Sequence, residues 1–374
     1  MTAGSDPARW SSGPIPSLDG IRAVAVALVF CAHGGFENFV PGGVGVTIFF
    51  VLSGYLITTL MRIEHGQRGR IGFRNFYLRR LLRLMPPLFI VVALAGTLSA
   101  LSIIDGGFTT GGLFAALFYA GNYYLISHDF NGMPAGVGVV WSLAIEEHYY
   151  LLFPPLAALL LRVGSARLSF GVLSALCAGV LAWRCWLVLH GGSTAYLTMA
   201  TDTRVDAILV GCLLALIRNP WLEGMVTSSR RYDLAVAAIS VGVLVGTLTF
   251  RTEGFRVTAR YTLQSLAIAA LIYLAVARAD RLPFRWLSAR PVAYVGSVSY
   301  TIYLSHHMIL RGLAKHWPQW STFQLMAVGA VLALALAEPM RRWIEQPFAR
   351  LRRLLHRTSS GSEPAARLLS VGTP

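Results

Sequence analysis

Three ionisable residues, Asp19, Arg22 and His33, interrupt an otherwise apolar stretch that covers residues 18–36. If this stretch is helical, Arg22 and His33 are separated by three turns plus about 20°, and by about 16 Å along the axis. Both side chains therefore lie on one face of the predicted helix. An imidazole titrates close to neutral pH, so His33 is a candidate general base that takes a proton from a hydroxyl.

A second group of ionisable residues lies in Trp141–Tyr150, where Glu146, Glu147 and His148 are adjacent. Two neighbouring carboxylates inside an apolar segment are costly to bury unless a cation offsets their charge. On a helix their side chains point about 100° apart, so one can face a polar cavity while the other pairs elsewhere. We expect Glu146 or Glu147 to be the charge partner of His33, and a structural ion pair with an arginine is the alternative.

Arginine is concentrated in residues 62–83, which contain seven of them. Arg79, Arg80 and Arg83 form a basic surface at the predicted start of a helix. Guanidinium groups bind phosphate bidentately, which makes these residues candidates for holding the phosphates of a substrate. Attraction to anionic lipids explains the same pattern equally well, and both interpretations stay open.

Long apolar segments must position these groups. Hydrophobic residues make up 55% of the 374 residues and charged residues 13%, about half the charged fraction of soluble proteins. This composition predicts an all-α integral membrane protein. The eleven apolar blocks are residues 18–36, 44–62, 84–104, 111–127, 140–161, 168–189, 204–217, 232–250, 261–277, 292–310 and 322–340.

Basic residues predict the orientation of these blocks. If the N-terminus is cytoplasmic, 24 of the 32 basic residues fall in segments on the cytoplasmic side and five in segments on the opposite side. Cytoplasmic loops of membrane proteins carry such an excess. We therefore predict a multi-pass protein of the cell (inner, cytoplasmic) membrane with both termini in the cytoplasm. The same distribution accounts for the net charge of +15 without a nucleic-acid partner.

Both termini can be cytoplasmic only if one of the eleven blocks does not cross the membrane. The glycines and the asparagine within residues 111–127 favour this block as a re-entrant or broken element, because such backbone is tolerated only where protein surrounds it. The alternative is that residues 140–161 form the partial element. The prediction is thus about ten transmembrane helices plus one possible re-entrant element.

The ends of the chain lack apolar blocks. We predict a polar N-terminal tail at residues 1–17, a membrane domain at residues 18–350 and a C-terminal tail at residues 351–374 that is basic and then disordered. The four cysteines form no Cys-x-x-Cys pair, and the adjacent His306 and His307 cannot share a helix face. No metal site is expected.

Taken together, these motifs resemble the acyltransferase-3 family of polytopic membrane acyltransferases. That family acylates bacterial surface glycans and some secreted small molecules. The resemblance covers about residues 15–350. The matching pieces are LDGIR followed by histidine at the Arg-x10-His spacing, GVGVTIFFVLSGYLI, YLRRLLRL with its two prolines, WSLAIEEHYYL, SYTIYLSHH and IEQPF.

The resemblance implies an enzyme that moves an acyl group, commonly acetyl, from acyl-CoA to a hydroxyl of a carbohydrate or glycoconjugate. Acyl-CoA is then a co-substrate, and no bound cofactor is expected. In the family the histidine of the first helix is regarded as catalytic and the basic segment is linked to acyl-CoA. We assign catalytic roles to His33, Glu146 and Glu147, and substrate or acyl-CoA binding to Arg22, Arg79, Arg80, Arg83, Tyr303 and His306.

Several alternatives stay open. His33 either takes the proton of the acceptor hydroxyl or carries the acyl group itself. Thr47 stands where the family usually has aspartate, so either a carboxylate near His33 comes from elsewhere in the chain or His33 works with hydrogen-bond support alone. The acceptor is a glycan or a secreted small molecule such as a macrolide sugar. A non-enzymatic transporter or lipid-handling protein would use the same buried charges as a proton or substrate path.

Overall fold

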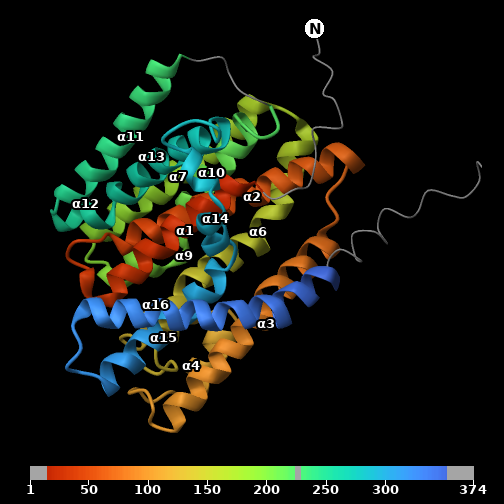
Figure 1. Ribbon diagram of the computed structural model, residues 1–374. Coiled ribbons are helices and arrows are strands. Elements are labelled where there is room, and N and C mark those ends of the chain that lie inside the picture. Colours follow the sequence, from red (N-terminus) through yellow and green to blue (C-terminus); the bar gives the residue numbers. More distant parts are fainter. Residues whose placement is uncertain (1–14, 224–228, 352–374) are drawn as a thin grey trace, which may run out of the picture.

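The computed structural model describes residues 15–223 and 229–351, and the regular structure within these ranges is entirely helical (Figure 1). The prediction of an all-α membrane protein is confirmed. Nearly all of the two predicted tails, residues 1–17 and 351–374, lies outside the described residues.

The first half of the chain contains three long helices, a broken element and a fourth long helix. Their bounds are α1 Pro16–Cys31, the π-helical turn η2 Ala32–Phe36, α2 Gly42–Arg68, α3 Phe73–Ala100, α4 Thr110–Leu117, α5 Gly121–Ser127, the 3-10 turn η3 Val137–Val140 and α6 Trp141–Val163.

The second half alternates long helices with short ones. Their bounds are α7 Ala166–Leu189, α8 Thr194–Met199, α9 Thr201–Arg204, α10 Asp206–Ile217, α11 Arg230–Thr249, α12 Glu253–Val257, α13 Ala259–Ala277, η4 Arg285–Ser288, α14 Arg290–Ser297, α15 Ser299–His316, α16 Thr322–Pro339 and η5 Met340–Glu345.

Seven of the described helices are long and apolar enough to cross a membrane: α1, α2, α3, α7, α11, α13 and the helix that begins with α16. The other three predicted spans correspond to α6, α10 and α15. Polar residues reduce the hydropathy of α6 and α15, since α6 carries the paired glutamates and α15 carries two histidines, while α10 is only 12 residues long.

Residues 111–127 form two short helices, α4 and α5, of eight and seven residues. The chain breaks between them at Tyr119, which has a positive φ of 56°. A helix of this length rises only about 12 Å, well short of the roughly 30 Å of a bilayer core. By contrast, α6 is a continuous helix of 23 residues. The choice of 111–127 as the broken element is therefore confirmed over the alternative at 140–161.

The helix α2 lies at the centre of the bundle, with 78% of its apolar span buried in protein, while α7 and α11 have 11% buried and face outwards. Figure 1 shows α11 at the edge of the molecule, against α13. The closest partner of α2 is α10. A Cβ at Gly54 of α2 would lie 1.9 Å from the carbonyl oxygen of Ile208, and one at Gly211 would lie 2.1 Å from that of Val51. Glycine at both positions lets the two backbones touch.

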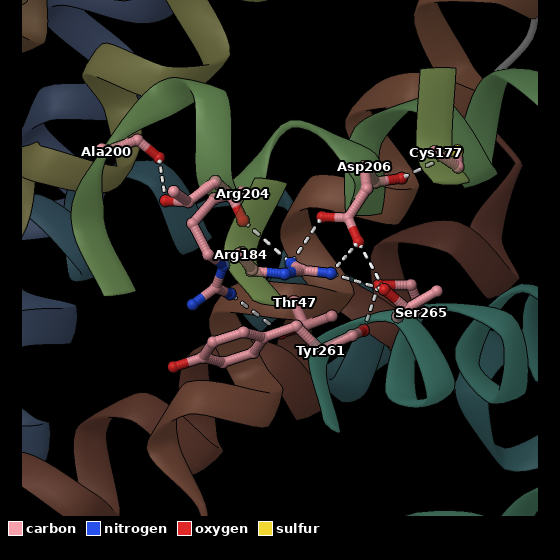
Figure 2. Close-up of polar contacts among 10 residues, drawn as sticks. Thr47, Cys177, Arg184, Ala200, Arg204, Asp206, Tyr261 and Ser265 are labelled. Carbon is pink, nitrogen blue, oxygen red and sulfur yellow. Dashed lines mark hydrogen bonds and ion pairs between the residues drawn. The ribbon is translucent and has the colours of Figure 1, made fainter. Parts of the chain in front are cut away.

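A buried ion pair ties three helices together next to this contact (Figure 2). Arg184 of α7 donates to both carboxylate oxygens of Asp206 on α10, at 3.1 and 2.7 Å. Thr262 of α13 donates to the same carboxylate at 2.8 Å. Both charged side chains are fully buried, so breaking the pair would leave an uncompensated charge in the interior.

Candidate active site

His33 lies in the π-helical turn η2, directly after the last residue of α1. Within the turn, Gly35 has a φ of 104°, a conformation that side-chain-bearing residues rarely adopt. Single π-helical turns are frequent at functional sites, because the extra residue re-aims a side chain. Here the turn carries His33 out of the helix packing, and its side chain is exposed.

The partner of His33 is His306, at the middle of α15. Nδ1 of His33 lies 2.8 Å from Nε2 of His306. Nδ1 of His306 faces two backbone carbonyl oxygens, those of Tyr303 at 2.7 Å and Ile302 at 3.2 Å. A carbonyl oxygen only accepts hydrogen bonds, so Nδ1 of His306 carries its proton and Nε2 has a lone pair.

This assignment fixes the tautomer of neutral His33. Its Nδ1–H donates to Nε2 of His306, which leaves the lone pair of neutral His33 on Nε2. His307 stacks on the same imidazole, with ring centroids 4.8 Å apart. His33 is therefore held in one orientation by a buried acceptor and a stacked ring, with a basic nitrogen left available for chemistry.

His33 lines a cavity of about 720 Å³, called here the His33 cavity. The cavity is bounded by the chain between α1 and α2, by α8 and α9, and by the segment around α12. Its polar and charged lining residues are His33, Glu37, Asn38, Thr198, Arg204, Arg251, Arg256, Arg260, Tyr261, Gln264 and Tyr303.

A second cavity of about 330 Å³, called here the Arg83 cavity, lies around the other end of α1. Three arginines and three carboxylates line it. Its charged lining residues are Asp19, Arg22, Arg80, Arg83, Glu146 and Glu345, and its tyrosines are Tyr150, Tyr300 and Tyr303.

Interactions within the Arg83 cavity hold its charged groups in place. Arg22 pairs with Asp19 at 2.6 Å. The guanidinium of Arg80 lies over the ring of Tyr150, 5.1 Å from its centroid. Glu146 accepts hydrogen bonds from Ser53 at 2.9 Å and from Tyr150 at 3.1 Å.

Tyr303 and Val46 line both cavities, so the two approach each other at these side chains. Tyr303 is buried on α15, one turn before His306. Its hydroxyl donates to the carbonyl oxygen of Val139 at 3.1 Å and lies 2.7 Å from the hydroxyl of Ser142. These contacts hold Tyr303 at the boundary between the His33 cavity and the Arg83 cavity.

The structure brings together most of the predicted donor-site residues, since Arg22, Arg80, Arg83 and Tyr303 all line the Arg83 cavity. Arg79 was predicted with them, but it lines neither of these two cavities and pairs instead with Glu64 at 3.0 Å. The reason is geometric: adjacent residues on α3 point about 100° apart, so Arg79 and Arg80 face different neighbours.

The structure does not place the predicted carboxylates at His33. Glu146 lines the Arg83 cavity, and Glu147 has a buried oxygen, Oε1, without a hydrogen-bond partner. The residue in contact with His33 is His306, which was expected at the substrate. His306 is fully buried and lines neither of the two cavities, so its position suits support of His33 rather than substrate contact.

Comparison with known proteins agrees with the resemblance seen in the sequence. The family described as the acyltransferase domain matches residues 15–338, most of the chain. The chain belongs to this family. Among solved structures, none matches it.

Three relatives with similar sequences come from three bacterial species. The YrhL protein of Bacillus subtilis (strain 168) is 33% identical over 89% of this chain and 54% of its own length. The peptidoglycan O-acetyltransferase OatA of Listeria monocytogenes is 30% identical over 81% of this chain and 50% of its own. The O-acetyltransferase OatA of Staphylococcus aureus (strain NCTC 8325) is 30% identical over 90% and 58%. The chain thus spans about half the length of the curated relatives it matches.

Sequence reasoning missed the arginines of the His33 cavity: Arg204, Arg251, Arg256 and Arg260. A signal for three of them was present. Residues 251–260 hold three of the five basic residues on the side of the membrane predicted to be poor in them. A cluster that runs against the positive-inside pattern calls for a local explanation, and the cavity supplies one.

Proposed function

We propose that the chain is a membrane-embedded O-acyltransferase that moves an acetyl group from acetyl-CoA to a hydroxyl of a glycan. Its family and its O-acetyltransferase relatives support this class of reaction. The name of the Listeria relative specifies peptidoglycan, which favours a glycan over a secreted small molecule. The observation that carries the proposal is His33, exposed on a cavity wall with its Nδ1 proton held by His306.

The donor enters through the Arg83 cavity. The phosphates of CoA bind the exposed arginines just before and at the start of α3, Arg70 and Arg74. The uncharged pantetheine arm suits the cavity interior, whose arginines face carboxylates. The thioester then lies near Tyr303, where the two cavities approach each other.

The acceptor enters through the His33 cavity, and its hydroxyl oxygen attacks the thioester carbonyl carbon. The hydroxyl proton goes to Nε2 of His33 as the new C–O bond forms. The C–S bond breaks, and CoA leaves as a thiolate that takes this proton back. The imidazolium present between these steps keeps its Nδ1–H on the lone pair of His306. The products are an O-acetyl ester and CoA.

The distribution of arginine favours a cytoplasmic opening for the Arg83 cavity and an opening on the opposite side for the His33 cavity. The two cavities lie around opposite ends of α1, because Asp19 and Arg22 lie in its first two turns and His33 follows its last residue. Acetyl-CoA is a cytoplasmic metabolite and surface glycans lie outside, so this orientation connects the two substrates through one protein.

The test is the transfer of labelled acetyl from acetyl-CoA to peptidoglycan fragments by the full chain in detergent. Loss of a general base typically lowers turnover by about 10²–10⁴-fold, and this loss is expected for His33→Ala. His316→Ala is the matched control, because His316 is exposed at the end of α15 and lines neither cavity. Near-normal turnover by His33→Ala, with CoA binding intact, would refute the mechanism.

A further inference from the structure

The His33 cavity carries more positive charge than the proposed reaction uses. Four arginines line it, Arg204, Arg251, Arg256 and Arg260, and Glu37 is its one carboxylate among the described residues. Within those residues, none of the four arginines lies within 4.0 Å of a carboxylate. The cavity is therefore a strongly positive space beside the candidate base.

Arg204 is the most deeply placed of the four, with only 2% of its surface exposed. Its Nη1 donates to the carbonyl oxygen of Thr198 at 3.2 Å, its Nη2 makes a long contact of 3.4 Å with the hydroxyl of Thr47, and its Nε has no partner. Its guanidinium stacks on Tyr261, 3.6 Å from the ring centroid (Figure 2). A buried cation without a carboxylate is costly, so this one calls for an anion.

The two acidic residues nearest to Arg204 in the sequence both have other partners. Asp202, two positions earlier, accepts hydrogen bonds from Trp183 and Tyr196. Asp206 follows two positions later, but both of its oxygens accept from Arg184, and one also accepts from Thr262 (Figure 2). Figure 2 shows the guanidinium of Arg184 directed at the carboxylate of Asp206, whereas that of Arg204 is directed at the ring of Tyr261. The fold thus gives the charge of one buried arginine a carboxylate partner and leaves the other on the cavity wall.

The other three arginines extend the positive surface from the wall to the mouth. Arg260 is partly buried, with an Nε that has no partner, and its guanidinium lies 5.3 Å from the centroid of Tyr261. Arg251 and Arg256 are exposed, on either side of the start of α12. A like-charged cavity of this kind raises the local concentration of an oppositely charged ligand, and guanidinium groups match carboxylate and phosphate oxygens.

We propose that the His33 cavity selects an anionic acceptor, a sugar that carries a carboxylate or a phosphate near the hydroxyl to be acylated. The anionic group binds Arg204 and Arg260, and the exposed arginines attract it to the mouth of the cavity. The assignment of this ligand as the acceptor rests on the proposed function. The anion site itself rests on the arginines alone and can be tested without any acyl transfer.

Binding of sugars to the purified full chain, without a donor, tests the anion site by calorimetry. N-acetylmuramic acid and N-acetylglucosamine differ by a lactyl carboxylate, and glucose 1-phosphate and glucose differ by a phosphate. The acids are expected to bind at least about tenfold more tightly than their neutral counterparts, as expected for a charge-assisted hydrogen bond. Comparing the two pairs distinguishes a carboxylate from a phosphate as the favoured group.

Thr47→Asp places a carboxylate beside Arg204 and is expected to weaken binding of the acids about tenfold, while the neutral sugars are unaffected. Thr47→Asn is its neutral control of matched size. Because position 47 is fully buried, a second pair avoids the interior. Arg251→Gln with Arg256→Gln is expected to weaken acid binding by a similar factor, and Arg230→Gln with Arg231→Gln, exposed on α11, is not.

Equal binding of acids and neutral sugars by the unaltered chain would overturn the proposal. The proposal would also be overturned if the Arg251 and Arg256 variant lost CoA binding while its sugar binding stayed unchanged. These arginines would then form part of the donor-binding site. The proposed function fails separately. Tight binding of the acids by a chain without transferase activity refutes the proposed function and supports the anion site. Equal transfer to acidic and neutral sugars supports the proposed function and refutes selection of an anionic acceptor.

Discussion

The two cavities of this protein are both rich in arginine but treat its charge differently. In the Arg83 cavity, Arg22, Arg80 and Arg83 share the walls with three carboxylates. In the His33 cavity, four arginines share the walls with one. Compensated charge makes a polar but nearly neutral channel, whereas uncompensated charge makes a site for an anion. This difference is the basis for proposing an uncharged substrate arm in the first cavity and an acidic group in the second.

The largest effect that would sharpen this comparison is expected at His306, which supports the base without lining either cavity. His306→Ala leaves Nδ1 of His33 without its acceptor, and turnover is expected to fall about 10²-fold, since tautomer control of a catalytic histidine is worth this much or more. The KM values for both substrates are expected to change little.

The matched variant is His306→Gln, whose amide oxygen can accept the same hydrogen bond and is expected to restore part of the turnover. Equal loss in both variants, together with raised KM values, would mean that His306 serves packing or substrate contact instead.

A smaller effect, about tenfold, is expected on donor affinity when charge is removed from the Arg83 cavity. Arg80→Gln with Arg83→Gln should raise the KM for acetyl-CoA about tenfold and leave the KM for the acceptor unchanged, because one charged hydrogen bond is worth about this factor. Steady-state kinetics with each substrate varied in turn gives both values.

Arg79→Gln is the control for this prediction, because Arg79 pairs with Glu64 outside the cavity. If the cavity variants reduced only the amount of protein in the membrane, with the KM for acetyl-CoA unchanged, attraction to anionic lipids would account for these arginines.

The smallest effect is expected at Glu146. Glu146→Gln keeps an acceptor for Ser53 and Tyr150 but removes one negative charge from the Arg83 cavity. The KM for acetyl-CoA is expected to fall by about threefold, with turnover nearly unchanged, because a more positive cavity attracts the CoA phosphates at the adjacent basic surface more strongly. Loss of turnover at constant KM would instead support the catalytic role that was predicted for Glu146 from the sequence.

Much of the architecture could be predicted from local patterns. Apolar block lengths predicted helices, and the glycines of residues 111–127 predicted the break that the structure has at Tyr119. The spacing of Arg22 and His33 placed these residues at opposite ends of one helix, where each now lines a different cavity. Such features depend on residues close in sequence, which is why the pattern was enough.

The partner of His33 could not be found in this way. His306 is 273 residues distant, and only the packing of α15 against the end of α1 brings the two rings together. The glutamates were the obvious polar candidates, but the direction of α6 turns Glu146 towards Ser53 of α2. The lack of a carboxylate partner for Arg204 could not be predicted either. The sequence places Asp206 two residues away, and only the fold shows that this carboxylate pairs with Arg184.

In the proposed reaction, acetyl passes from one side of the membrane to the other between these two cavities. The most direct measurement uses sealed proteoliposomes in which acetyl-CoA is trapped inside and a glycan acceptor is present only outside. Chains oriented with the Arg83 cavity inwards are expected to produce O-acetylated glycan outside, and His33→Ala to produce none. If acetylated product formed only when donor and acceptor were on the same side, transfer between the two cavities would be contradicted.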